Sequence, residues 1–517
     1  MIPTYIGFTI SGIAIILLAR FSALAMFSML ILCGLFSGAA AISLPALGGS
    51  SIPPVSFCLG FLLLRLLVLG SQYGPIARQA FRQNILLWVF ALYGIAIALI
   101  GPHLFGNVIK VVPMRGTDAK IWATYPLVFS PQNITTSFYL FATAVTATCA
   151  YVVCRLRGGA ETLVGTAVVL VAIHMTLGVV SVLFANTPVM QALSVFRNGN
   201  YAQLDQSVNG YVRMTGIMPE PSAFAGFGFT WGVFLIECWY RDVRPRITGG
   251  LGLAMVFILL ASTSSTAYVS IAAYMLLFLL RIVLVPDRVR VDKILVVSVV
   301  ATIVAALIVI TLLAVPALVE QLTKMVADLT VHKQTSTSGI QRAFWARQGL
   351  SAFVASTGLG IGPGSFRSSS IVTAVLGATG IVGAVSLTCY VILVLKPLRS
   401  STYNRPTGFA DATGVAASWA AICLLIPASI ASPTADPGSD FAILAGSALA
   451  LRLRSRPGIS ADIHDGDGSG EFPKSEALAW RAPFVRSSQL TRPAAGMSEV
   501  EGFPLACDRR NACYGNL

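Results

Sequence analysis

The stretch TSGIQRAFWARQGLSAFVASTGLGIGPGSFRSSS, residues 337–370, is a long polar-rich interval in an otherwise apolar chain. It lies between two apolar segments, residues 294–316 and 371–395, that are long enough to cross a bilayer. The stretch is therefore expected to be a connection outside the membrane spans. Its second half holds residues that permit sharp turns and close backbone approach: Gly358, Gly360, Gly362, Pro363 and Gly364.

Three arginines lie in the same stretch, Arg342, Arg347 and Arg367. A guanidinium group presents several donors in a rigid fork, so it suits planar anions with several oxygens. A pyrophosphate is such an anion, and it needs two or more cations in fixed positions. We expect the three arginines to bind an anion, with the backbone of Gly362 and Gly364 close to the ligand.

The composition indicates that most of the chain lies in a membrane. Its 517 residues are 56% hydrophobic and only 11% charged, whereas about a quarter of the residues are charged in a soluble domain. Apolar segments long enough to span a bilayer recur almost end to end. We predict an all-α, polytopic transmembrane helical bundle of about 12 to 13 spans. The predicted spans are residues 2–19, 22–42, 53–70, 84–101, 132–153, 161–184, 222–240, 247–261, 265–285, 294–316, 371–395, 411–430 and 439–452.

Short basic clusters lie between these spans and predict their orientation. Alternating spans bring six clusters to one side, which the positive-inside rule makes the cytoplasm. The connections at 185–221, 262–264 and 317–370 then face outward. Topology also accounts for the formal net charge of +14, so we expect no nucleic-acid partner. The clusters are Arg78 and Arg82; Arg155 and Arg157; Arg241, Arg244 and Arg246; Arg281, Arg288, Arg290 and Lys293; Lys396, Arg399 and Arg405; and Arg452, Arg454 and Arg456.

The chain divides into a transmembrane domain, residues 1–456 with the outer loop 317–370, and a tail, residues 457–517. The tail is rich in Gly, Pro, Ser and acidic residues without an apolar period, so we expect it to be disordered in the cytoplasm. Residues 2–19 lack a basic leader and a cleavage site, which predicts a retained first span. The nine cysteines make no metal-binding spacing. We therefore expect no metal site and no cofactor.

A second charged motif, YVRMTGIMPEPSAFAGF at 211–227, leads into the span at 222–240. Arg213 and Glu220 precede a predicted helix, with Pro221 at its first position. Charged residues next to apolar segments are costly, so each is a functional candidate. A salt bridge in which Glu220 complements the helix dipole explains the same residues without any ligand.

The turn STSSTAY at 262–268 is a run of hydroxyls between two spans. Ser264 and Ser265, with the amides of a helix N-terminus, would suit an anion, although a hydroxyl-rich cap is the simpler explanation. The remaining titratable residues carry weaker signals. His174 is expected to pack within a span, and His103 and His332 lie in predicted outer loops without a motif around them. The predicted outer loops also carry acidic residues, which could bind sugar hydroxyls or simply be solvated: Asp205, Glu320, Asp328, Asp436 and Asp440.

Three ordered motifs resemble the O-antigen ligase and polysaccharide polymerase superfamily of bacterial envelope proteins, often called the Wzy or WaaL type. They are RMTGIMPEPS at 213–222, STSST at 262–266, and SGIQR at 338–342 followed by GLGIGPGSFRSS at 358–369. TGIVG at 379–383 follows at a fitting distance. The resemblance implies a metal-independent, inverting glycosyltransferase that takes a glycan from an undecaprenyl-pyrophosphate carrier at the outer face of the inner membrane.

The resemblance also assigns roles to residues. It implies that Arg213 and Arg342 hold the pyrophosphate leaving group and that Glu220 lies beside the reacting sugar. Arg347, Arg367, Ser264, Ser265, Gly362 and Gly364 are the further substrate-binding candidates. One departure bears on the branch: the ligases carry a His-Asn pair whose histidine would fall at Ser369. Its absence favours chain polymerisation over transfer by an O-antigen ligase.

We therefore expect an exopolysaccharide or O-antigen polymerase whose partners are the lipid-linked oligosaccharide, membrane lipid, a flippase and a chain-length regulator. Its active site would face the periplasm. A lipid-linked oligosaccharide flippase or a polysaccharide-export permease remains the alternative from another functional class, because it explains the spans equally well. It leaves the long outer loop without a role.

Overall fold

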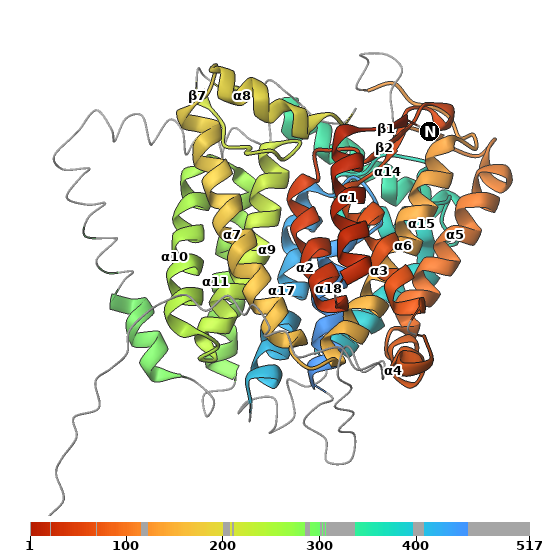
Figure 1. Ribbon diagram of the computed structural model, residues 1–517. Helices are drawn as coiled ribbons and strands as arrows, with labels where there is room; N and C mark the ends of the chain where they lie inside the picture. The colour runs from red at the N-terminus through yellow and green to blue at the C-terminus, as the bar shows by residue number, and fades with distance from the viewer. Residues whose placement is uncertain are drawn as a thin grey trace, which may run out of the picture. The chain divides into compact units, whose positions relative to one another are not determined.

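The computed structural model describes residues 2–20, 22–68, 70–114, 122–199, 207–208, 211–284, 290–299, 302, 306, 337–395 and 408–452. These lie within one compact unit, Met1–Asp467, and they form an all-α polytopic bundle (Figure 1). Among them, seven helices are long and apolar enough to cross a membrane. These are α5 (Ile85–Phe105), α6 (Pro131–Arg155), α7 (Gly159–Leu183), α9 (Pro221–Tyr240), α11 (Ser265–Leu284), α15 (Ile371–Leu395) and α17 (Phe409–Ala431).

Shorter helices and short extended segments complete the described residues. The helices are α1 (Tyr5–Arg20), α2 (Ala23–Cys33), α3 (Pro54–Val68), α4 (Gly70–Gln83), α8 (Pro188–Leu193), α10 (Pro245–Ala261), α14 (Thr337–Ala355) and α18 (Gly438–Arg452), with 3-10 turns at Gly34–Phe36, Pro45–Leu47 and Ser194–Arg197. The antiparallel strands are β1 (Ile2–Pro3), β2 (Ile42–Leu44) and β3 (Ser50–Ile52), then β4 (Lys110–Val111) with β5 (Tyr125–Pro126), and β6 (Ser207–Val208) with β7 (Tyr211–Val212).

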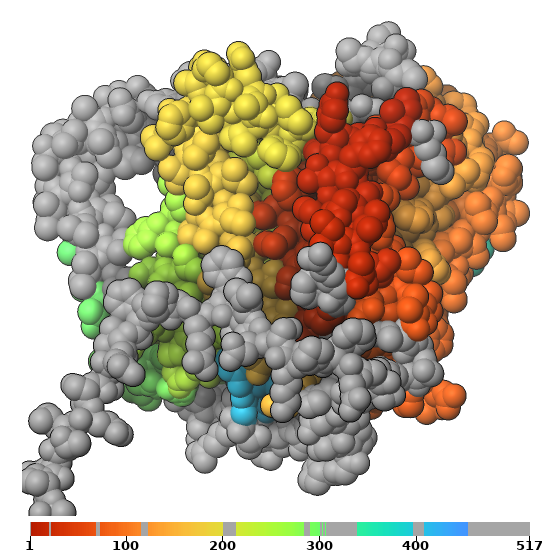
Figure 2. Space-filling model, in the orientation of Figure 1, coloured from red at the N-terminus to blue at the C-terminus, as the bar shows by residue number. Residues whose placement is uncertain are grey.

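The outer surface of several helices is apolar, as contact with lipid requires. On α1, drawn red in Figure 2, Tyr5 and Phe8 are 87% and 64% exposed. A hydrophobic face of this size on a soluble protein would be an aggregation site. On a polytopic helical bundle, hydrocarbon covers it.

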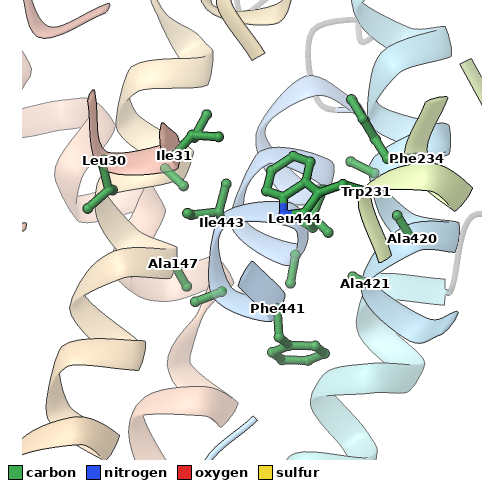
Figure 3. Packing of buried hydrophobic residues seen from close by; sticks show 14 of the residues in the cluster. Leu30, Ile31, Ala147, Trp231, Phe234, Ala420, Ala421, Phe441, Ile443 and Leu444 are labelled. Atoms are coloured by element: carbon green, nitrogen blue, oxygen red, sulfur yellow. The ribbon is translucent and has the colours of Figure 1, made fainter. Parts of the chain in front are cut away.

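The interior is built around α18, which packs against α6 and α17. Helices in lipid associate chiefly by packing, and small residues let their backbones approach. Gly446 of α18 lies so close to the Ala147 carbonyl of α6 that a Cβ atom there would overlap with it. Figure 3 shows Phe441, Ile443 and Leu444 of α18 between the side chains of α6 and those of α9 and α17. Small residues therefore place a short helix at the centre.

Two predicted segments differ from the observed ones. The span expected at 22–42 ends at Cys33, and a 3-10 turn and β2 follow. The chain turns because Gly38 packs directly on the backbone of Ile217 to Pro219, which leaves no room for a helix with side chains. The connection around Arg78 is itself a helix, α4.

The predicted outer loop 317–370 is partly a helix, and this is the largest correction. Its first part, 317–336, lies outside the described residues, as does the tail 457–517. Residues Thr337–Ala355 form α14, which packs along α15. Successive residues from α14 onward lie beside successive residues of the segment that leads into and forms α15. Arg342 lies beside Ser369, Gly349 beside Thr373, and Gly358 beside Ile381. The helix thus runs inward beside α15.

Residues 356–370 then return to the start of α15, which makes a re-entrant hairpin. The hairpin reaches Gly380, about 14 Å along α15 at 1.5 Å per residue, or nearly half of a hydrocarbon core of about 30 Å. Non-helical backbone is tolerated at such depth only when the protein buries and hydrogen-bonds it. Residues Gly360 to Phe366 are all buried.

A break in α15 provides the partners for this backbone. Gly380 has φ 59° and ψ −157°, so the helical hydrogen bonding is interrupted there. The freed carbonyls of Gly377 and Ala378 accept hydrogen bonds from the amides of Ile361 and Gly362, at 2.9 and 3.0 Å. The broken helix and the re-entrant loop therefore satisfy each other's backbone hydrogen-bonding groups.

Several basic residues of the predicted cytoplasmic clusters lie at one end of the bundle. Arg452 donates to the Val394 carbonyl at the end of α15, and the Arg244 guanidinium lies over Phe409 at the start of α17. Arg281 and Arg241 share the carboxylate of Glu237. Alternating spans predict this arrangement. The predicted span 294–316 is described only in part, and residues 291–299 are helical.

Candidate functional site

The candidate site lies at the opposite end, where α9 begins. Glu220 adopts an extended conformation and its carbonyl accepts the amide of Phe224, so it caps α9 with Pro221 at the first helical position, as predicted. Its carboxylate accepts a hydrogen bond from the Ser222 hydroxyl. This short contact fixes the carboxylate near the end of the helix, where the helix dipole favours a negative charge.

Three arginines from distant parts of the chain form an electrostatic group with this carboxylate: two interact with Glu220, and the third interacts with those two. Arg213 precedes α9, Arg342 lies on α14, and Arg367 ends the re-entrant loop. Burial and the neighbouring Arg342 lower the pKa of Arg213, while Glu220 opposes that shift. Burial also lowers the pKa of Arg367, against the effect of Glu220. Glu220 thus interacts with Arg213 and Arg367, Arg342 repels both of these arginines, and the group of three cations and one carboxylate keeps a surplus of positive charge.

Arg367 is held rigidly although its charge is not neutralised. Its backbone amide donates to the Val112 carbonyl at 2.9 Å, and its guanidinium lies 4.4 Å from the centre of the Trp345 ring. A cation over an indole face gains about 0.5 to 2 kcal/mol. The guanidinium is therefore positioned before any ligand arrives.

Ser369, where the resembling ligases carry a histidine, has a structural contact. Its hydroxyl donates to the Arg342 carbonyl at 2.6 Å. This hydrogen bond links α14 to the residues before α15 and fixes the position of Arg342 along α15. A serine bonded in this way is no substitute for an imidazole base.

Several buried polar atoms of this region lack a partner among the described residues. They include Arg367 Nε and Ser264 Oγ, and also Trp345 Nε1 and Gln348 Oε1 of α14. Leaving such a group unsatisfied costs about 1 to 3 kcal/mol. Buried polar groups normally have a protein or water partner, so a bound ligand or ordered water is expected here.

The hydroxyl-rich turn at 262–268 contacts the arginines of the candidate site through a backbone carbonyl. Arg213 Nη2 donates to the Thr263 carbonyl at 3.5 Å. Ser264 is buried, and its carbonyl accepts the amide of Tyr268, while its hydroxyl has no described partner. The simpler explanation, that this turn caps α11, thus holds for the backbone carbonyl of Ser264 but not for its hydroxyl. Ser265 is the first residue of α11.

The predicted substrate-binding glycines Gly362 and Gly364 pack against neighbouring helices. A Cβ atom on Gly362 would overlap with Ile97 and Ala98 of α5, and one on Gly364 with Gln132 and Asn133 of α6. Both have positive φ, 99° and 86°. Their role is to let the re-entrant loop pack against helices, because only glycine fits both the space and the backbone angles.

Arg347 also differs from its prediction. It is exposed, on the face of α14 with Leu350 and Val354, whereas Gly349 and Ala352 face α15. Five residues separate it from Arg342, which at about 100° per residue turns it well away from that side chain. The structure does not bring Arg347 to the other arginines.

The remaining candidates lie elsewhere. His174 is buried, 3.2 Å from the Phe224 carbonyl and stacked on its ring, which confirms its packing role. His103 stacks on Phe129. Asp436 accepts from Thr143, and Asp440 from Trp231, within the bundle. Asp205, Glu320, Asp328 and His332 lie outside the described residues.

Sequence reasoning missed three residues near the site. Trp345 is three residues after Arg342, a spacing that places both on one side of a helix. Tyr268 acts on the charge of Arg213 and lies one turn after Ser264. Arg197 donates from Nη2 to the carbonyl of Pro219, beside Glu220, at 3.4 Å. Trp345 could have been found once α14 was treated as a helix, and Tyr268 already lay in the predicted span 265–285, one helical turn after Ser264.

Comparisons with known proteins add no identity. Neither the scan of protein-family models nor the search of curated proteins gave a match for this chain. In the described part of the chain, no group of three or more His, Cys, Asp and Glu is placed to hold a metal ion. The site is therefore described by its own residues: three arginines, one carboxylate and a hydroxyl turn at one end of a helical bundle.

Proposed function

We propose that this chain is a polysaccharide polymerase that joins undecaprenyl-pyrophosphate-linked repeat units at the outer face of the bacterial cytoplasmic membrane. The observation that carries the proposal is the electrostatic group formed by Arg213, Arg342, Arg367 and Glu220. A surplus of fixed guanidinium groups suits an anion with several oxygens, and a pyrophosphate attached to a lipid arrives through the membrane.

The reaction is a displacement at the anomeric carbon of the donor sugar. A hydroxyl of the acceptor attacks this carbon, and the bond from the carbon to the pyrophosphate oxygen breaks with inversion. The leaving pyrophosphate keeps the electron pair, and the arginines stabilise its growing charge. Glu220 takes the proton of the attacking hydroxyl, with Ser222 orienting the carboxylate. Each charge that forms thus has a named partner on the protein.

Arg342 tests the proposal most sharply, because α14 offers a matched control. Arg342→Ala should lower the elongation of lipid-linked repeats by purified, reconstituted protein about 100- to 1,000-fold, which is typical for removing one group that stabilises a developing charge. Arg347→Ala, on the exposed face of the same helix, should keep the wild-type rate. Equal rates for wild type and Arg342→Ala would overturn the assignment.

One observation favours a second candidate, a flippase or export permease. Broken helices such as α15 at Gly380 are common at the substrate sites of transporters. The two functions differ in what accumulates when the protein is lost. Without a polymerase, single repeat units collect on the carrier at the outer face, whereas without a flippase they stay at the inner face. An O-antigen ligase is less favoured, since Ser369 is bonded to the Arg342 carbonyl.

A further inference from the structure

A large apolar groove lies between α9, α10 and α11, and none of the arginines of the candidate site lines it. Its volume is about 510 Å³, within the range of pockets that hold small ligands. Residues Val296 and Val297 close part of it. Leu253, Phe257 and Leu260 of α10 line the groove and are each at least 40% exposed. The groove therefore opens on a face of the helices that lipid would cover.

The groove is long enough for a whole lipid chain. Its lining on α10 runs from Arg246 to Leu260, a rise of about 21 Å at 1.5 Å per residue. One leaflet occupies about half of a hydrocarbon core of about 30 Å. Gly250 leaves room in the wall of the groove, since a Cβ atom at this position would meet nothing within 4 Å.

One end of the groove is cationic. Arg246 is exposed and lines the groove beside Trp239 and Tyr240. Aromatic residues of these types mark the headgroup level of membrane proteins. The groove is thus apolar along its length, with aromatic rings and a positive charge at one end.

The acids at this end already have cationic partners. Asp242 pairs with Arg290 and Lys293, and Asp292 pairs with Arg290. Glu237 pairs with Arg241 and Arg281. Among the described residues, none of these carboxylates pairs with Arg246. Its charge complements an anion supplied from outside the chain.

We propose that this groove binds an acyl chain of an anionic membrane phospholipid, whose phosphate pairs with Arg246. The groove supplies the apolar wall, and Arg246 supplies the charge that selects anionic over zwitterionic headgroups. The inference is independent of the proposed enzymatic function. The Arg246 end of the groove lies at the end of the bundle where the predicted cytoplasmic clusters lie, which is where anionic headgroups are attracted.

The test is lipid retention by the full-length protein, measured by native mass spectrometry after exchange with phosphatidylglycerol or phosphatidylcholine of equal chain length. The wild type should retain phosphatidylglycerol about fivefold more strongly, as expected for one well-placed basic residue. Arg246→Gln should abolish this preference. Arg78→Gln, which removes an exposed basic residue on α4, should leave it unchanged.

A second variant tests the groove itself. Gly250→Leu places a side chain in open space and improves helix propensity, so the protein should fold while retention of both lipids falls. Gly60→Leu on α3, where a Cβ atom also meets nothing within 4 Å, should retain both. Unchanged retention in Gly250→Leu, or a preference that survives Arg246→Gln, overturns the proposal. So does displacement of phosphatidylglycerol by a long-chain polyprenyl phosphate, which would assign the groove to the carrier.

Discussion

Helix α9 carries two glutamates with opposite surroundings, Glu220 at its start and Glu237 in its last turn. Glu237 is fully buried and its carboxylate is saturated. It accepts from Tyr274 at 2.7 Å and from Arg281 at 3.1 Å, and it pairs with Arg241. Arg281 in turn lies over the rings of α9, α11 and α17. This cluster has partners for its carboxylate on every side and links three helices.

The cluster at Glu220 is open. Arg213 and Arg367 interact with the Glu220 carboxylate and Arg342 acts on both arginines, but among the described residues no arginine forms an ion pair with Glu220 as Arg241 and Arg281 do with Glu237. A buried charge is costly unless it is paired, so a protein keeps such a surplus where a ligand completes it. The comparison teaches how to separate the two kinds of buried arginine in this chain. A cluster whose carboxylate is ion-paired with its arginines serves stability, whereas one with more arginines and no described ion pair is a candidate for function.

The largest effect is expected at the saturated cluster. Glu237→Ala would leave Arg241 and Arg281 without their carboxylate inside the bundle, which should destabilise the protein by about 3 to 5 kcal/mol. Thermal unfolding in detergent would measure this loss. If the melting temperature did not change, Glu237 would not be the link between the three helices.

At the open cluster, the expected loss is in the reaction. Glu220→Gln should lower the transfer rate about a hundredfold, the lower range for removing a general base, with little change in the melting temperature. Single-turnover transfer with lipid-linked repeats would measure the rate. A variant that unfolded like Glu237→Ala would show that Glu220 is a structural residue and that the comparison fails.

The break in α15 at Gly380 helps to hold the re-entrant hairpin whose two arms carry Arg342 and Arg367 of the open cluster. Gly380→Ala would force a side chain against the carbonyl of Gly358 at a positive φ, and such strain costs about 1 to 3 kcal/mol. We expect a lower melting temperature together with slower transfer, because Arg342 and Arg367 are held by this hairpin. Gly12→Ala on α1, which meets no atom within 4 Å, is the control and should change neither. Unchanged transfer in Gly380→Ala would separate the hairpin from the site.

The smallest effect concerns the orientation of one arginine. Arg367→Lys keeps the charge but loses the planar contact with Trp345, so transfer should fall only about fivefold, as expected for about 1 kcal/mol of cation–π interaction. Trp345→Leu should give a similar loss, and the double variant should cost no more than either alone. Additive losses would mean that the two side chains act separately.

Local pattern was sufficient for most of the helices. The span expected at 371–395 coincides with α15, and that at 265–285 ends within one residue of α11. Hydrophobicity and length are properties of a short segment, so they can be evaluated without knowing its neighbours. The same local signal failed at 22–42, because α2 ends at Cys33 and the chain beyond it packs Gly38 against the backbone of another segment.

The amino-acid sequence by itself determined a polytopic helical membrane protein and named Arg213, Glu220, Arg342 and Arg367 as candidates. Only the tertiary structure decided which of the residues meet. It turned Arg347 away, used Gly362 and Gly364 for packing, and made part of the predicted outer loop a re-entrant hairpin under Arg367. The reason is physical: the hairpin depends on carbonyls that a break in α15 exposes, and hydrogen bonds between segments are not encoded in the hydrophobicity of either one.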